Sequence, residues 1–127
     1  MLDPAVRSVL DAASFAHLAT VGPDGAPHSA PVYIGARGEQ VVFFTGPNTR
    51  KARNLQADPR VAVSIVPAGK WWEPIVLRGQ VVERIEGDDA WAIIDELSAK
   101  YTDEPYPRDD ARVVFVVEPE YQKVGIG

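Results

Sequence analysis

The chain has 127 residues, of which 46% are hydrophobic, and carries a formal net charge of −5 at pH 7. This length predicts a single domain over residues 1–127 with one hydrophobic core. The negative charge argues against general binding to nucleic acid, which favours a basic surface, and the absence of cysteine excludes disulfides and thiolate metal sites. The sequence has no signal-peptide pattern and no stretch of membrane-spanning length, so we expect a cytoplasmic protein with no membrane partner.

The first third of the sequence predicts a short helix followed by three strands. Asp3 can cap a helix that holds Pro4 in its first turn and reaches about residue 13. The pair Asp24-Gly25 suits the turn of a β-hairpin. Alternating or β-branched and aromatic residues place the strands at 15–21, 28–35 and 41–45.

The middle of the sequence predicts a second helix between strands. Asn48 or Thr49 can act as its N-cap, and Asp58 ends it because a residue before proline avoids helical backbone angles. Gly79 is expected at a bulge or bend. The predicted helix covers 49–57, and the strands cover 60–66 and 75–86.

The last third predicts a third helix, 87–101, in which Asp88 or Asp89 complements the helix dipole. We expect an exposed loop at 102–110. The final strands are placed at 111–119 and 121–127. Six or seven short strands and three short helices predict a mainly β fold, a barrel or a sandwich with minor helices.

Four cations lie close together in this acidic chain, at Arg50, Lys51, Arg53 and Arg60. Arg50 and Lys51 fall in the first turn of the second predicted helix, where cations are unfavourable unless an anion such as phosphate binds there. The alternative is a solvated helix face that pairs with surface carboxylates. Arg60 can pair with Asp58.

No side chain is predicted as a catalytic acid or base. His17 is expected to be a buried histidine within a strand, and His28 is expected at the surface. Two histidines at this spacing form no recognisable metal site, so no metal is predicted.

Four segments in order resemble the pyridoxamine 5'-phosphate oxidase-like split β-barrel superfamily of flavin and deazaflavin proteins. They are FAHLATVGPDGAPHSAPVYI (15–34), VVFFT (41–45), RKARNLQADPRVAVSI (50–65) and IVLRGQVV (75–82). The resemblance covers roughly residues 5–86. It implies a six- to seven-stranded split β-barrel with the FMN-binding fold of this superfamily.

The resemblance also implies a flavin-type cofactor at a homodimer interface. In such proteins, the matching strand lines the ring and ribityl chain, the end of the third strand helps to hold the cofactor, and the two cations grip its phosphate. The implied residues are Ser29, Ala30, Pro31, Val32, Tyr33, Ile34, Phe44, Thr45, Arg50 and Lys51. Arg53 and Asn54 are further candidates for holding the cofactor. Trp71, Trp72 and Tyr33 are candidate walls of the ring pocket, and Tyr106 and Tyr121 are secondary candidates for the same pocket.

Two departures from the true oxidases bear on the substrate. Pro74 stands where those enzymes carry a glutamine, and the chain ends in YQKVGIG in place of their arginine-containing segment. Vitamin B6 synthesis is therefore not expected. The sequences of segments 19–33 and 54–65 look more like those of a small actinobacterial branch of the superfamily. Members of this branch often use coenzyme F420, a deazaflavin with a phosphate and a glutamyl tail.

The resulting prediction is an F420-dependent oxidoreductase that transfers hydride to a small electron-poor or conjugated substrate. The first alternative is an FMN-dependent oxidoreductase on the same fold. The second is a non-catalytic protein that binds a flavin, a deazaflavin or a haem-like ligand. The third is a dimeric interaction domain in which Arg50 and Lys51 pair with carboxylates.

Overall fold

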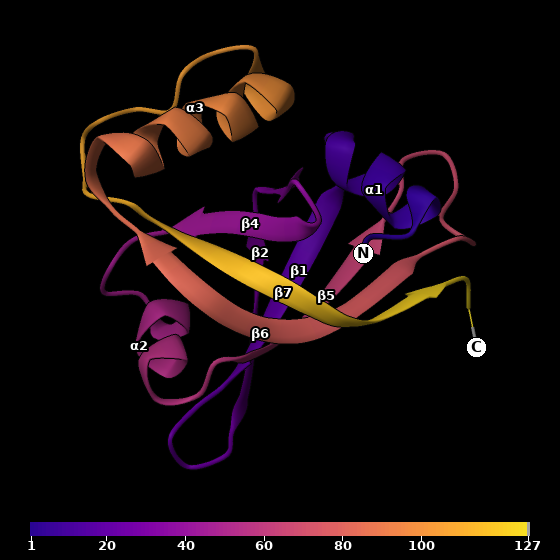
Figure 1. Cartoon of the computed structure of the whole chain (residues 1–127), viewed down its shortest axis with the longest axis horizontal. Coiled ribbons are helices and arrows are strands. Elements are labelled where there is room, and N and C mark those ends of the chain that lie inside the picture. Colours follow the sequence, from indigo (N-terminus) through magenta and orange to yellow (C-terminus); the bar gives the residue numbers. More distant parts are fainter. Residues whose placement is uncertain (127) are drawn as a thin grey trace.

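The computed structural model describes residues 1–126, which form three helices and seven strands (Figure 1). The helices are α1 (Pro4–Asp11), α2 (Arg50–Ala57) and α3 (Gly87–Thr102). The strands are β1 (Phe15–Val21), β2 (Pro27–Val32), β3 (Ile34–Arg37), β4 (Gln40–Thr45), β5 (Arg60–Val66), β6 (Ile75–Ile85) and β7 (Val113–Val124). The predicted mainly β fold, a split barrel of six to seven strands, is confirmed with seven strands.

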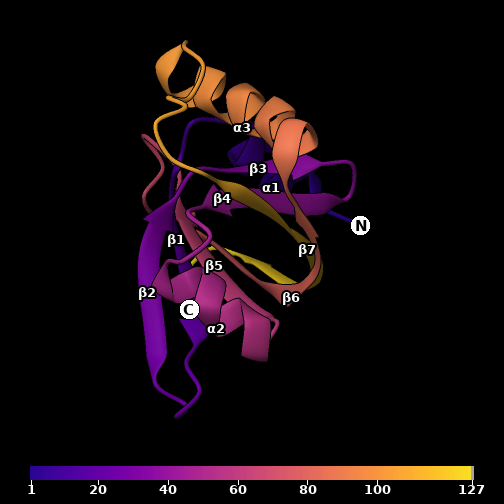
Figure 2. The same cartoon turned by 90° about the vertical axis from the view of Figure 1, so that its left-hand side faces the viewer.

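A single residue, Tyr33, links the two edges of the sheet. All neighbouring strands are antiparallel in the order β2-β1-β5-β6-β7-β4-β3, so β2 and β3 are the two edge strands. Since only Tyr33 separates them, the sheet has to curl until its edges meet, as Figure 2 shows. The predicted continuous strand 28–35 is therefore wrong: the chain leaves the ladder with β1 at Val32 and starts the ladder with β4 at Ile34.

Two apolar clusters cover the two faces of the sheet where β4 and β7 run. Inside the barrel, Phe43 and Phe115 pack with the interior residues of the other strands. Outside it, Phe44 and Val114 pack against Ile94 of α3, which lies across this face in Figure 1. Burial on both faces explains why β4 and the first half of β7 are continuous apolar runs rather than alternating ones.

The close pairing of β6 with β7 depends on Gly79. The register shifts between Arg78 and Gly79, as predicted for a bulge. Here β7 continues through Pro119, so the two predicted strands 111–119 and 121–127 are one strand, Val113–Val124. Residue 127 lies outside the described residues.

The predicted ends of α2 are confirmed. Thr49 is the N-cap, and its hydroxyl accepts a hydrogen bond from the Ala52 amide at 3.3 Å. Asp58 ends the helix with an extended backbone and forms an ion pair with Arg60 at 2.6 Å. The hydrogen bonds from Arg60 lower the pKa of the Asp58 carboxyl to about 2. In α1, by contrast, Asp3 occupies the N-cap position but its side chain makes no cap hydrogen bond.

We expect Gly79→Ala to destabilise the fold. A Cβ atom at this position would lie 2.1 Å from the carbonyl oxygen of Glu118, so β6 and β7 would have to separate. The free energy of unfolding should fall by about 2 kcal/mol or more, as measured by urea denaturation. Val82→Ala, at an exposed position on the same strand, is the control and should cost less than about 0.5 kcal/mol. Equal stability of Gly79→Ala and the wild type would contradict the close contact.

Candidate functional site

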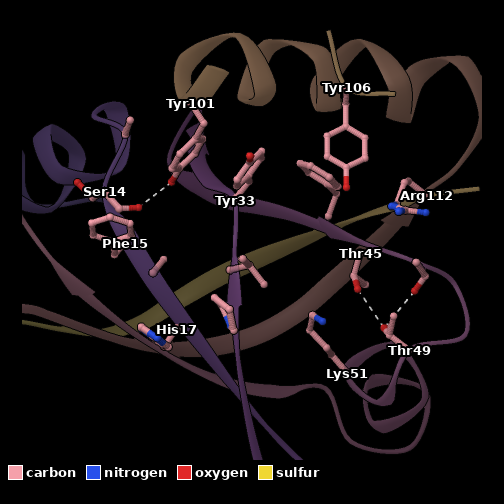
Figure 3. Close-up of a pocket in the computed structure, with 16 residues that line it drawn as sticks. Ser14, Phe15, His17, Tyr33, Thr45, Thr49, Lys51, Tyr101, Tyr106 and Arg112 are labelled. Carbon is pink, nitrogen blue, oxygen red and sulfur yellow. Dashed lines mark hydrogen bonds between the residues drawn. The ribbon is translucent and has the colours of Figure 1, made fainter. Parts of the chain in front are cut away.

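A cleft of about 670 Å³ opens where the two edges of the sheet meet (Figure 3). Its walls come from the start of β1, the end of β2, Tyr33, the end of β4, the start of α2, the end of α3 and the segment between α3 and β7. This volume is in the range of sites for small molecules and cofactors, which are roughly 300–1,000 Å³. The split between the edge strands is therefore the place where a ligand fits.

One wall of the cleft is aromatic. Tyr33 stacks on Tyr101 with ring centroids 4.3 Å apart, and Phe44 meets Tyr33 and Tyr106 edge to face at 5.7 and 4.9 Å. The Tyr101 hydroxyl donates a hydrogen bond to the Ser14 carbonyl at 2.9 Å and so fixes its ring. Burial raises the pKa of this hydroxyl above its ordinary value. A wall of fixed rings suits a flat, apolar ligand.

The opposite wall is polar and positive. In Figure 3, Lys51 of α2 and the N-cap residue Thr49 face the cleft beside Thr45, with Arg112 above them. Burial lowers the pKa of the Lys51 ammonium. Among residues 1–126, neither Lys51 nor Arg112 forms an ion pair with a carboxylate. Two cations without acidic partners in a cleft are suited to an anionic ligand.

The hydroxyls between these cations can contribute to an anion site. Thr49 donates to the Gly46 carbonyl at 3.1 Å and lies 3.0 Å from the Thr45 hydroxyl. Either hydroxyl can donate in the contact between them. When Thr49 donates to Gly46, Thr45 can turn its own hydrogen toward an anion. The amide groups of the first turn of α2 add a positive dipole at the same place.

The segment between α3 and β7 is anchored. Arg108 forms two hydrogen bonds with Asp95 at 2.5 and 2.6 Å, and its guanidinium lies over the Trp91 ring at 4.2 Å. Asp95 also accepts from the Tyr106 amide at 3.2 Å. The prediction of a merely solvated loop at 102–110 was therefore incomplete, because Tyr106 is half-buried and faces the cleft.

The structure brings about half of the predicted site residues to the cleft. Those that line it are Pro31, Val32, Tyr33, Phe44, Thr45, Lys51 and Tyr106. The others lie elsewhere in the described chain and do not line it: Ser29, Ala30, Ile34, Arg50, Arg53, Asn54, Trp71, Trp72 and Tyr121.

Two of these other residues are buried. Ile34 is fully buried in the barrel core. The buried Asn54 amide donates to the Thr20 hydroxyl at 3.0 Å and ties α2 to β1. Arg50, Arg53 and Trp72 are exposed.

The sequence patterns did not assign several residues of the cleft to the site, among them two on β1 and two that lie later in the chain. Phe15 and His17 on β1 line it, and His17 is exposed, so the prediction of a buried histidine was wrong. Period-two alternation does place both on one face of β1, but it does not show that this face borders a cleft. Tyr101 and Arg112 have no local pattern, because only tertiary packing brings them here.

Among the described residues there is no match to a metal-binding cluster or to a membrane-spanning helix. Residues 1–126 contain no cluster of three or more potential metal ligands. Within the same range, none of the helices is both long enough and apolar enough to cross a bilayer.

We expect Tyr101→Phe to lower the free energy of unfolding by about 1 kcal/mol at neutral pH, because the Ser14 carbonyl loses its donor. The folded-state pKa of Tyr101 is raised above 10.0, so folded chains keep a proton that unfolded chains lose. Wild-type stability should then decline as the pH rises above about 10. This decline should be smaller in the variant.

Denaturant unfolding at several alkaline pH values measures both effects. Tyr121→Phe, at a position that is 40% exposed, is the matched control and should change neither. A parallel alkaline decline in wild type and Tyr101→Phe would contradict the assignment.

The comparisons with known proteins agree with this architecture. The profile of the family described as Pyridoxamine 5'-phosphate oxidase matches residues 2–123. The chain is 32% identical over 106 residues to a pyridoxine/pyridoxamine 5'-phosphate oxidase of Chromobacterium violaceum, covering 83% of this chain and 46% of that protein. It therefore spans less than half the length of this relative.

Solved structures share the whole barrel. An F420 reductase superposes with a TM-score of 0.85 at 30% identity, covering 96% of this chain and 98% of that one. HutZ, a heme storage protein from Vibrio cholerae, superposes with a TM-score of 0.73 at 19% identity, covering 98% and 94%. From the profile match and the curated relative, the chain belongs to the pyridoxamine 5'-phosphate oxidase family.

Proposed function

We propose that this protein binds the deazaflavin F420 in the cleft and, as an oxidoreductase, transfers hydride to a small electron-poor or conjugated substrate. The observation that carries the proposal is the pairing of two walls: fixed aromatic rings on one side, and Lys51 with two threonine hydroxyls on the other. A ligand that matches both walls has a flat ring and an anionic tail.

The residues present fit such a cofactor. Lys51 is half-buried with a lowered pKa and has no carboxylate partner in residues 1–126, so a phosphate would restore the stability of its charged form. Phe44 and Tyr106 provide an apolar surface next to this group. When bound, a reduced deazaflavin or flavin would supply the hydride.

The chain's own contribution is positional. The aromatic wall would orient the ring and exclude water from one side. Lys51 and Thr45 would hold the phosphate and so fix the distance between the ring and the substrate. No residue is assigned as a catalytic acid or base.

The choice of F420 over FMN rests on the F420 reductase neighbour, which matches nearly the whole of both chains. FMN is the first alternative because it also joins a phosphate to a tricyclic ring. A non-catalytic haem-like ligand is the second, and one observation favours it: His17 lines the cleft and is exposed, as a haem ligand would have to be.

We also propose that the protein is a homodimer and that the second copy covers the open side of the cleft. One end of the sheet exposes large apolar side chains: Phe15, Val66, Trp71, Trp72, Val124 and Ile126. Phe15 pairs with Val66 across adjacent strands and lines the cleft while 77% exposed. An apolar surface that runs into the cleft is typical of an interface.

We expect purified apo protein to bind F420 more tightly than FMN, at about micromolar strength. Lys51→Ala should raise the dissociation constant by roughly tenfold or more because it removes a charge-assisted hydrogen bond to phosphate. Quenching of cofactor fluorescence in parallel titrations measures both. Gln56→Ala, at an exposed position of the same helix, is the control and should not change either constant.

The other outcomes are equally informative. Preferential FMN binding would move the protein to the flavin alternative, and binding of haem alone, seen in its absorption spectrum, would favour the haem-like alternative. Binding of none of the three would overturn the proposal. A loss of thermal stability in Lys51→Ala would count against a ligand-binding role for this side chain.

We expect wild-type protein to sediment as a dimer and Val66→Glu to raise the dimer dissociation constant by about tenfold or more, because the interface would bury an unpaired charge. The control is Val82→Glu, since Val82 is also exposed but lies far from the interface. Ile75 pairs with Ile65, next to Val66, and Val82 lies about 23 Å further along β6 from Ile75. A monomeric wild type, or equal weakening by both variants, would contradict this interface.

A further inference from the structure

We propose that Lys100 is a positioning residue for the cleft: it fixes the stacked rings of Tyr33 and Tyr101, against which the flat part of the ligand would lie. This inference deepens the proposed function and rests on it. Lys100 does not itself line the cleft. It stands directly before Tyr101 in α3, and its ammonium binds the residue directly after Tyr33.

The ammonium of Lys100 joins three elements. It donates to the carbonyl of Leu10 in the last turn of α1, at 2.6 Å, and to the carbonyl of Ile34 at the start of β3. Leu10 is among the last four residues of its helix, whose carbonyls have no partner within the helix, and β3 is an edge strand. One charged donor shared between these two carbonyls holds α1, β3 and α3 together at a single point.

Gly35 lets α3 approach β3 closely enough for this contact. A Cβ atom at Gly35 would lie 2.5 Å from the Cδ2 atom of Leu97 and 3.5 Å from the Nζ atom of Lys100. Lys100 lies in the last turn of α3, where the negative end of the helix dipole stabilises a cation. Burial lowers the pKa of the ammonium, and the Asp11 carboxylate opposes this shift. The cost of half-burying this charge is thus offset by its carbonyl partners.

The contact lies next to both rings of the stack. Tyr33 and Tyr101 are nearly parallel, with an angle of 6° between the ring planes. The Ile34 amide, which follows Tyr33, donates to the Tyr101 hydroxyl at 3.5 Å. Because Lys100 binds the carbonyl of the same residue, consecutive residues of α3 hold both the amide and the carbonyl of Ile34. The position of the stack therefore depends on Lys100.

Tyr101 carries the connection to a second strand. Its hydroxyl donates to the Ser14 carbonyl at 2.9 Å, as Figure 3 shows. Ser14 directly precedes β1, whose residues Phe15 and His17 line the cleft. The last turn of α3 therefore ties the start of β1 to the start of β3, although these strands lie toward opposite ends of the strand order. Such a tie sets the width of the cleft beside the rings and preorganises the ring site.

The test separates the ring site from the phosphate site. FMN is paired with riboflavin, and F420 is paired with its deazaflavin core lacking the phosphate and tail. Each is titrated by fluorescence quenching into wild type, Lys100→Met, Lys100→Arg and Ala99→Met. Methionine keeps an apolar stem and removes the ammonium, whereas Ala99→Met places the same side chain at the adjacent exposed position as the matched control.

For the pair that wild type binds, we expect Lys100→Met to raise the dissociation constant of the phosphate-free ligand by roughly fivefold or more, because the ring stack loses a charge-assisted anchor. The ratio of the two constants within the pair, which reports the phosphate end, should stay at the wild-type value. Lys100→Arg should recover most of the loss, since it keeps a charged donor. Ala99→Met should change neither quantity.

Thermal unfolding of each variant gives the temperature range in which it is folded, and the titrations are made within that range. If Lys100→Met does not fold, Lys100→Gln takes its place, because it keeps an uncharged donor and carries the same expectations. Lower thermal stability with an unchanged constant for the phosphate-free ligand would show a purely structural role for Lys100 and would overturn the inference.

Three other results would also overturn it. Equal effects of Lys100→Met and Ala99→Met would indicate a general disturbance of α3. A changed ratio with an unchanged constant for the phosphate-free ligand would place the effect of Lys100 at the phosphate. Binding of only the phosphorylated ligands by wild type would show that the rings contribute little. Each of these leaves the proposed function intact, whereas failure of wild type to bind any of the four ligands would overturn both.

Discussion

The structure depends on one short connection. Tyr33 is the only residue between β2 and β3, although these strands form opposite edges of a seven-stranded sheet. A connection of this length forces the sheet to curl until its edges meet, yet the two edges form no ladder with each other. The gap that results is the cleft, and the residue that causes it also contributes the central ring of its aromatic wall.

The same curl of the sheet brings together the residues of the positively charged wall of the cleft. The end of β4 is a buried strand end because apolar clusters cover both of its faces. The first turn of α2, capped by Thr49, begins five residues after the end of β4. On the other side of β4, the ladder brings in the first residues of β7. Local chain order therefore supplies Thr45 and Lys51, while strand pairing supplies Arg112.

This division explains what the sequence could predict. Period-two patterns, turn residues and caps located most elements, including the bulge at Gly79 and the end of α2 at Asp58, because these are set by neighbours in the chain. The break at Tyr33 was missed because the run 28–35 reads as one strand and only pairing partners divide it. His17 was predicted to be buried for a similar reason: alternation gives its face, but not what that face borders. Arg112 and Tyr101 gave no pattern at all.

The negative net charge of the chain makes the unpaired cations of the cleft more notable. With a net charge of −5, the protein has ample carboxylates to pair with its cations, and it does so at Asp58 and Asp95. Lys51 and Arg112 are left without such partners among residues 1–126, and burial already disfavours the charged form of Lys51. A site that is less stable when empty gains stability when an anion binds, since a ligand selective for the folded state shifts the folding equilibrium. The lack of carboxylate partners within residues 1–126 is thus a feature of the proposed binding site.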